Sequence, residues 1–189
     1  MKCRLTASFA LLLVAVIASG REKSDTRWGI ATNAADWVYL ITVNASGQYA
    51  LSRHFSLEAQ ARWNPWSFRK ADDQLCQSRQ RTFSFGTRWW PWYSYSGWWM
   101  GARCQYQEYN RGGLKSPDTE EGDAAGLVLS GGYSIQLNRW LNIDLGFGFW
   151  GGRARYTTYA CPTCGIVTGG GSKTFFLPDE LLLSAMIVF

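Results

Sequence analysis

The sequence predicts an all-β fold: a closed antiparallel eight-stranded transmembrane β-barrel with up-and-down topology. Three observations lead to this prediction. Apolar and polar residues alternate over many segments of about ten residues, short and long connections follow one another, and a secretory N-terminal segment precedes a chain that has no further long apolar stretch. A membrane-spanning helix needs roughly 20 apolar residues. The mature chain would therefore stay soluble outside the cytoplasm or cross a membrane as strands.

The N-terminus has the pattern of a cleaved signal peptide. Lys2 and Arg4 are followed by the apolar residues 5–17 and then by small residues, an order typical of secretory signals. Cys3 precedes the apolar stretch, so a lipid anchor is not expected. We therefore predict a signal peptide at residues 1–20 and one outer-membrane barrel domain at residues 21–189.

Period-two alternation is clearest in residues 55–65, where one face is apolar and the other polar. Successive side chains of a strand point to opposite faces, whereas a helix would mix the two sets. The same pattern, weaker in three places, predicts about eight strands, each near the 9–11 residues that a transmembrane strand needs. The predicted strands are residues 27–37, 41–51, 55–65, 79–89, 98–107, 124–137, 141–150 and 181–189.

The connections between these segments differ in length. Residues 52–54, 91–97 and 138–139 are short, and three others are long and polar or rich in glycine. Outer-membrane barrels have short periplasmic turns and longer external loops. We therefore predict external loops at residues 67–78, 110–123 and 157–179.

Aromatic residues make up 16% of the chain, with 11 Trp. Trp and Tyr gather at membrane interfaces, where one end of the side chain is apolar and the other wet. The densest cluster surrounds a short turn and predicts a girdle at the periplasmic interface; a carbohydrate-stacking platform is the alternative. The predicted girdle residues are Trp89, Trp90, Trp92, Trp98 and Trp99. The terminal Phe189, at the end of an alternating segment, is predicted to be an assembly signal for the barrel-assembly machinery.

Charged residues on the polar faces are predicted to fill the barrel interior. An eight-stranded barrel is only wide enough inside for side chains, and buried charges need partners. We expect a salt-bridged plug, with a catalytic or proton-conducting interior as the alternative. The residues concerned are Glu58, Arg62, Arg88, Arg103 and Asp144.

Cys161 and Cys164 are expected to form a short-range disulfide, since the secretory leader implies an oxidising compartment. A metal site and a redox motif are the alternatives, but two thiols are half of the usual four zinc ligands, and the only histidine, His54, is predicted at the other end of the barrel. We predict no metal and no cofactor. The state of Cys76 and Cys104 is left open.

Several function classes are disfavoured. The net charge of +5 is scattered, whereas a nucleic-acid binder concentrates basic residues in a patch, so no nucleic-acid partner is expected. The chain has no Gly-x-Ser-x-Gly element. We predict a non-enzymatic outer-membrane barrel with a structural, adhesion or surface-assembly role through its external loops, in contact with outer-membrane lipid. The alternative is an outer-membrane lipid-modifying enzyme.

The chain also resembles a known family. The residues that carry the likeness are 31–33 (Ala-Thr-Asn), 63–68 (Trp-Asn-Pro-Trp-Ser-Phe), 130–133 (Ser-Gly-Gly-Tyr) and 161–165 (Cys-Pro-Thr-Cys-Gly). They are similar to an uncharacterised family of small outer-membrane barrel proteins of Bacteroidetes, a domain of unknown function. The resemblance covers residues 28–189 and implies a fold and a cellular location but no settled activity. Genes of this type often lie near fimbrial genes, which implies a surface or fimbrial protein as partner.

Overall fold

The computed structural model describes residues 27–38, 41–69, 75–112, 118–161 and 165–189, and every structural statement below concerns this part of the chain. The predicted signal peptide lies outside it. The described residues form strands and one short helix. In chain order these are β1 (Trp28–Asn33), α2 (Ala34–Val38), β2 (Val43–Ala50), β3 (Phe55–Asn64), β4 (Ser67–Arg69), β5 (Leu75–Trp89), β6 (Gly97–Gly112), β7 (Thr119–Gln136), β8 (Leu141–Tyr159) and β9 (Val167–Val188).

Eight of the strands form a hydrogen-bonded ring. Their order is β3-β2-β1-β9-β8-β7-β6-β5, every pair is antiparallel, and pairing of β3 with β5 closes the ring. The short β4 lies beside β5, beyond the end of β3. At the seam between β1 and β9, the backbones of Trp28 and Phe189 exchange two hydrogen bonds of 2.9 Å. The predicted all-β fold with eight antiparallel up-and-down strands is therefore confirmed.

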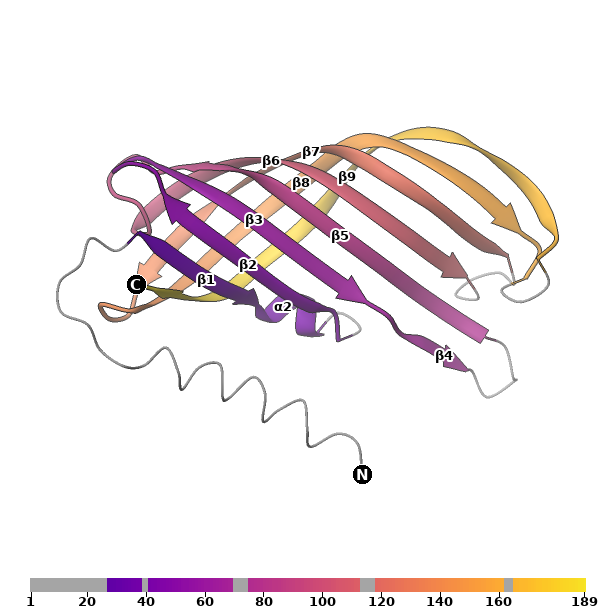
Figure 1. The fold of residues 1–189 in the computed structure, drawn as a ribbon, viewed down its shortest axis with the longest axis horizontal. Helices are drawn as coiled ribbons and strands as arrows, with labels where there is room; N and C mark the ends of the chain where they lie inside the picture. Colours follow the sequence, from indigo (N-terminus) through magenta and orange to yellow (C-terminus); the bar gives the residue numbers. More distant parts are fainter. Residues whose placement is uncertain (1–26, 39–40, 70–74, 113–117, 162–164) are drawn as a thin grey trace, which may run out of the picture.

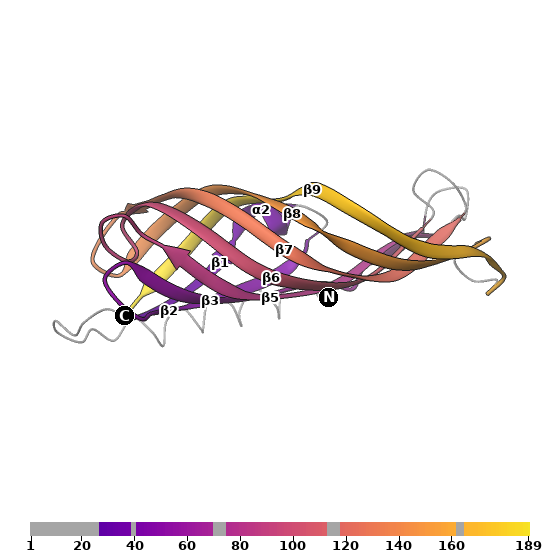
Figure 2. The ribbon, with the colours of Figure 1, turned by 90° about the horizontal axis from the view of Figure 1, so that it is seen from above.

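The strands fall into two length classes (Figures 1 and 2). β1, β2 and β3 have 6, 8 and 10 residues, whereas β5 to β9 have 15 to 22. The long strands therefore continue as a curved sheet beyond the ends of the short ones. Asn64, the last residue of β3, is opposite Gln80. We call the strands up to this row the closed part, and the ends of β5 to β9 beyond it the projecting sheet.

The three predicted long loops are wrong over most of their length. Residues 75–78 belong to β5, residues 119–123 belong to β7, and β9 begins at Val167. In these segments neither face is apolar, so the alternation used to predict the strands ends although backbone pairing continues. The short turns after β2, β5 and β7 lie where the sequence predicts them.

The first predicted strand, residues 27–37, is also too long. β1 ends at Asn33 and α2 follows. The Oδ1 atom of Asn33 accepts a hydrogen bond of 3.2 Å from the backbone nitrogen of Ala35, which is how an N-cap side chain satisfies a free donor at a helix start. No helix of the described chain, α2 included, is long and apolar enough to span a membrane.

Two of the predicted girdle residues are inside the ring. Trp90 and Trp99 are 0% and 2% exposed and pack with Tyr95 and Met186, whereas Trp89, Trp92 and Trp98 are exposed. The reason is alternation: in a pair of adjacent Trp residues on a strand, only one side chain can point outward. The indole of Trp99 fits because it faces glycine, and a Cβ at Gly132 would lie 2.7 Å from its Cζ2 atom.

Candidate functional site

The interior of the closed part contains a network of buried ion pairs. Arg88 is at the centre of its first part. Its Nη2 atom lies 2.6 Å from Oε1 of Glu58, and its Nε donates a hydrogen bond of 2.9 Å to Oε2 of the same carboxylate. Its Nη1 atom lies 2.9 Å from Oδ2 of Asp144. The side chains of all three residues are 1–3% exposed. Arg88 therefore joins carboxylates from β3 and β8 across the ring.

A second part of the network is centred on Arg103 and Arg62. Arg103 pairs with Glu180 and lies 3.4 Å from Glu58. Arg62 donates to Oδ2 of Asp179 at 2.8 Å and to Oε1 of Gln105 at 3.0 Å. Each arginine thus has a carboxylate partner, which is the condition under which charges are tolerated away from water.

All five charged residues that the sequence places inside lie in this network. Asp179 and Glu180 are missing from the prediction, because residues 157–179 were assigned to a loop and the last strand was begun at residue 181. The signal for Glu180 is present in the sequence. Leu181 and Leu183 face outward and are exposed, so period two places residue 180 inside.

Apolar clusters flank the charged network along the ring axis. On the turn side, the guanidinium of Arg88 stacks over the ring of Trp99 at 4.0 Å. On the other side, Tyr109, Val128 and Trp150 form a second buried cluster. Along β6 the order is Trp99, Arg103, Tyr109, so an apolar cluster, the ion pairs and a second apolar cluster follow one another along the ring axis.

Most of the outer face of the closed part is apolar, although β8 carries the exposed Arg153 opposite Ala125. On β6 the outward residues from Trp98 to Tyr106 carry no charge, and on β7 the outward residues from Ala125 to Ile135 carry none. Their large members are exposed, and include Met100, Leu127, Leu129 and Tyr133. The usual arrangement of a soluble protein, with apolar residues inside and charged residues outside, is therefore inverted.

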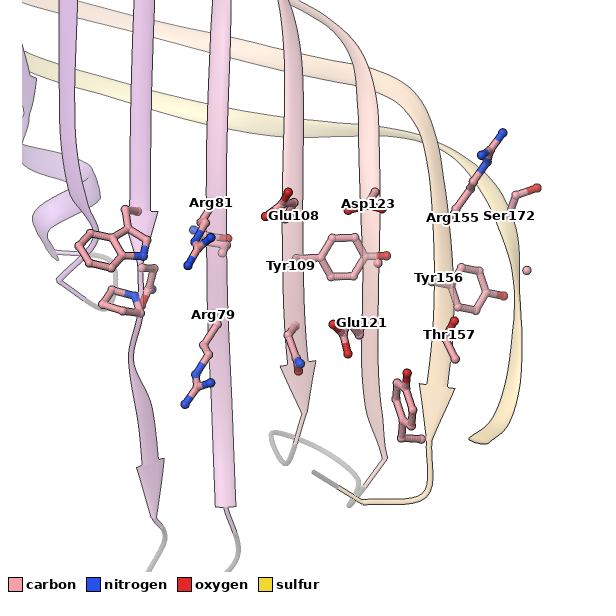
Figure 3. A pocket seen from close by; sticks show the side chains of 18 residues that line it. Arg79, Arg81, Glu108, Tyr109, Glu121, Asp123, Arg155, Tyr156, Thr157 and Ser172 are labelled. Carbon is pink, nitrogen blue, oxygen red and sulfur yellow. The ribbon is translucent and has the colours of Figure 1, made fainter. Parts of the chain in front are cut away.

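A row of charged residues ends this apolar surface. Arg81 is opposite Glu108, Glu108 is opposite Asp123, and Asp123 is opposite Arg155. All four side chains are exposed. We call these four residues the charged row; Figure 3 shows them on β5 to β8, together with the neighbouring Arg79, Glu121 and Thr157. They line a shallow concavity of about 1030 Å³.

A separate ion pair joins two strands of the projecting sheet. Nζ of Lys173 lies 2.6 Å from Oε1 of Glu120, which also accepts a 2.7 Å hydrogen bond from the hydroxyl of Tyr109. Partial burial opposes ionisation of Glu120, but these two hydrogen bonds outweigh it and lower its pKa from the ordinary value. Burial and the bond to Glu120 raise the pKa of the Tyr109 hydroxyl.

The cysteines and the histidine do not come together. Cys76 is a buried free thiol, Cys104 is an exposed free thiol on the outer face, and Cys164 lies outside the described residues, so its disulfide with Cys161 stays a prediction. His54 lies in the turn after β2, where its Nδ1 is 2.9 Å from the carbonyl oxygen of Trp90. In the described chain, no group of three or more His, Cys, Asp or Glu residues is arranged to hold a metal ion.

Comparison with known proteins identifies a family. The family model described as "Protein of unknown function (DUF3575)" matches residues 8–189. The chain belongs to the DUF3575 family. No curated protein and no solved structure matches the chain. The DUF3575 match spans the charged interior, the charged row and the projecting sheet, so all three belong to the family domain.

Proposed function

We propose that the chain is an outer-membrane β-barrel that is closed to solutes and holds its projecting sheet at the cell surface. The observation that carries the proposal is the inverted closed part: a mostly apolar outer surface around a buried network of ion pairs. Outer-membrane barrels alternate apolar residues toward lipid with polar residues toward the interior. A closed ring also leaves no strand edge unpaired in lipid.

The height of the apolar surface fits a bilayer. It covers nine residues of β6, from Trp98 to Tyr106, and eleven residues of β7, from Ala125 to Ile135. A tilted transmembrane strand needs about 9–11 residues. On the side of the short strands, the exposed Trp37, Val38 and Ile41 continue the apolar surface beyond β1.

The orientation follows from the two ends. The turns after β2, β5 and β7 match periplasmic turns, and the strand ends of the projecting sheet take the place that longer external loops have in outer-membrane barrels. In this orientation the exposed Trp89, Trp92 and Trp98 lie at the periplasmic interface, the charged row lies at the outer interface, and the projecting sheet faces the exterior. The resemblance to small outer-membrane barrels of Bacteroidetes supports the same placement. The sheet would then contact a surface or fimbrial protein.

The lipid-modifying enzyme has less support. Such an enzyme acting on outer-leaflet lipid needs its reactive groups near the outer interface. His54 lies at the turn end and bonds to a backbone carbonyl, and the buried arginines and carboxylates are bonded to each other. We therefore propose a non-enzymatic role.

Thiol labelling in cells tests the placement. Cys104 supplies a reporter on the apolar surface, and Thr157→Cys supplies one on the projecting sheet, each in a chain whose other cysteines are replaced by Ser. A membrane-impermeant maleimide should label T157C and spare Cys104, and both should react after solubilisation and unfolding. Equal labelling of Cys104 and T157C in intact cells would contradict membrane insertion.

Cross-linking tests the surface role. A photo-reactive residue at position 121, on the projecting sheet, should capture a surface protein, and the same residue at position 92, in a turn, should not. Wild-type lipid acylation in a deletion strain agrees with the non-enzymatic role, whereas a changed acylation pattern restored by wild type would favour the enzyme.

A further inference from the structure

The outer face of β2, β3, β5 and β6 carries an apolar groove that runs across these strands beside the charged row. The groove has a volume of about 730 Å³. Its floor consists of small residues that include Gly47, Ala59 and Ala61, and larger side chains such as Phe83, Phe85 and Tyr106 line it. A Cβ added to Gly47 would meet nothing within 4 Å, so the groove is open at that point.

The groove and the charged row are directly continuous. Ala61 is opposite Phe83, and Phe83 is opposite Tyr106. Two residues further along β5 and β6 on the same face, Arg81 is opposite Glu108. The hydroxyl of Tyr106 donates to Oδ1 of Asp123 at 3.1 Å, which connects the two regions through one side chain.

The charges of the row follow the order positive, negative, negative, positive, so that opposite charges face one another at both ends and like charges face one another in the middle. Glu108 and Asp123 are directly opposite one another, and like charges at such positions destabilise a sheet. Arginines flank them on both sides. Within the described residues, none of these four side chains forms an ion pair, although all are exposed. The row therefore presents two carboxylates between two guanidinium groups.

We propose that the groove and the charged row together bind a membrane lipid whose headgroup carries both a phosphate and an ammonium group. An acyl chain would lie in the groove, the phosphate would bind Arg81, and the ammonium would bind between Glu108 and Asp123. A purely anionic headgroup fits this row poorly because the two central carboxylates repel it. Guanidinium groups bind phosphate oxygens through charge-assisted hydrogen bonds.

This inference rests on the proposed membrane placement and names a ligand for that surface. Native mass spectrometry of the detergent-solubilised mature chain tests it, with phosphatidylethanolamine as the zwitterionic probe and phosphatidylglycerol as the anionic one. Wild type should retain one phosphatidylethanolamine and bind phosphatidylglycerol several-fold more weakly. Free phosphoethanolamine, which has no acyl chain, should not be retained.

The variants separate the headgroup from the chain. Arg81→Gln should weaken retention of both lipids about threefold to fivefold, as for loss of one exposed charge contact. Glu108→Gln should weaken only phosphatidylethanolamine and so narrow its advantage over phosphatidylglycerol. Gly47→Leu fills open space in the groove and should weaken both lipids. The control is Arg139→Gln, an exposed arginine in the turn after β7, which should leave retention unchanged.

Three outcomes would overturn the proposal: equal retention of the two lipids by wild type, an equal loss in R139Q and R81Q, or retention of free phosphoethanolamine as strong as that of the lipid. Failure of the membrane placement is recognised separately, because it would appear as labelling of Cys104 in cells, whatever the lipid selectivity in detergent.

Discussion

Five strands, β5 to β9, run through both the closed part and the projecting sheet, and the two regions follow different rules. In the closed part, outward positions such as Leu129 are apolar and inward positions such as Arg103 are charged and buried. In the projecting sheet, charged or polar residues occupy both faces, as Glu121 and Glu120 show on successive positions of β7. The change occurs at the charged row. One continuous strand can therefore pass through two environments, because backbone pairing is independent of which side chains face outward.

Removing a buried carboxylate should give the largest difference in stability between a change in the closed part and one in the projecting sheet. Glu58→Ala leaves Arg88 and Arg103 without their shared partner, and loss of one member of a buried ion pair costs about 3–5 kcal/mol. Denaturant titration of the folded protein in lipid vesicles measures this loss. Glu121→Gln, an exposed carboxylate beyond the charged row, should change the free energy of unfolding by less than about 0.5 kcal/mol. Equal effects of the two substitutions would contradict the distinction between the regions.

A charge on the apolar surface tests the outer face in the same way. Leu129→Arg places a guanidinium near the middle of the apolar surface and should destabilise the protein in a bilayer by about 2–4 kcal/mol. The same titration, compared with Thr157→Arg in the projecting sheet, gives the result. If L129R and T157R were equally stable in vesicles, the apolar surface would not face lipid.

Packing at the turn end gives an intermediate effect. Gly132→Val introduces a side chain against the neighbouring strand and the indole of Trp99, since a Cβ would lie 2.1 Å from the carbonyl oxygen of Leu145 and 2.7 Å from Cζ2 of Trp99. Overpacking of this kind costs about 1–3 kcal/mol. Gly47→Val, at a position open on the outer face, is the matched control and should cost less. The midpoints of denaturant unfolding compare the two, and a smaller loss for G132V than for G47V would show that both β8 and Trp99 move aside at this point.

The smallest effect concerns the ion pair of the projecting sheet. The pKa of Glu120 is lowered in the folded chain, so its contribution is present above the unfolded pKa, near 4.5, and is lost as the pH falls through the folded value. The pair is partly exposed, so we expect a contribution of less than about 1 kcal/mol. Hydrogen exchange of β7 and β9 should be faster at pH 3 than at pH 6, after correction for intrinsic rates. Glu120→Gln should remove this difference, and its persistence in E120Q would assign it to another group.

The alternation of the sequence determined the number of strands, their up-and-down order and the inward side of Glu58, Arg62, Arg88, Arg103 and Asp144. This was possible because the closed part keeps apolar residues outward, so the alternation within each strand shows which of its faces points outward. The short turns were predicted for the same reason, since they interrupt a strong pattern.

The tertiary structure alone decided where the long strands end. Beyond the charged row both faces are polar, so a paired strand and a polar loop have similar sequences. Register decided the rest. It placed Glu180 opposite Gly148 inside the ring and buried Trp99 against Gly132 and Gly146. It also brought Arg81, Glu108, Asp123 and Arg155 into one row. These residues come from four strands, and no local pattern in a sequence records which residues of different strands will be opposite one another.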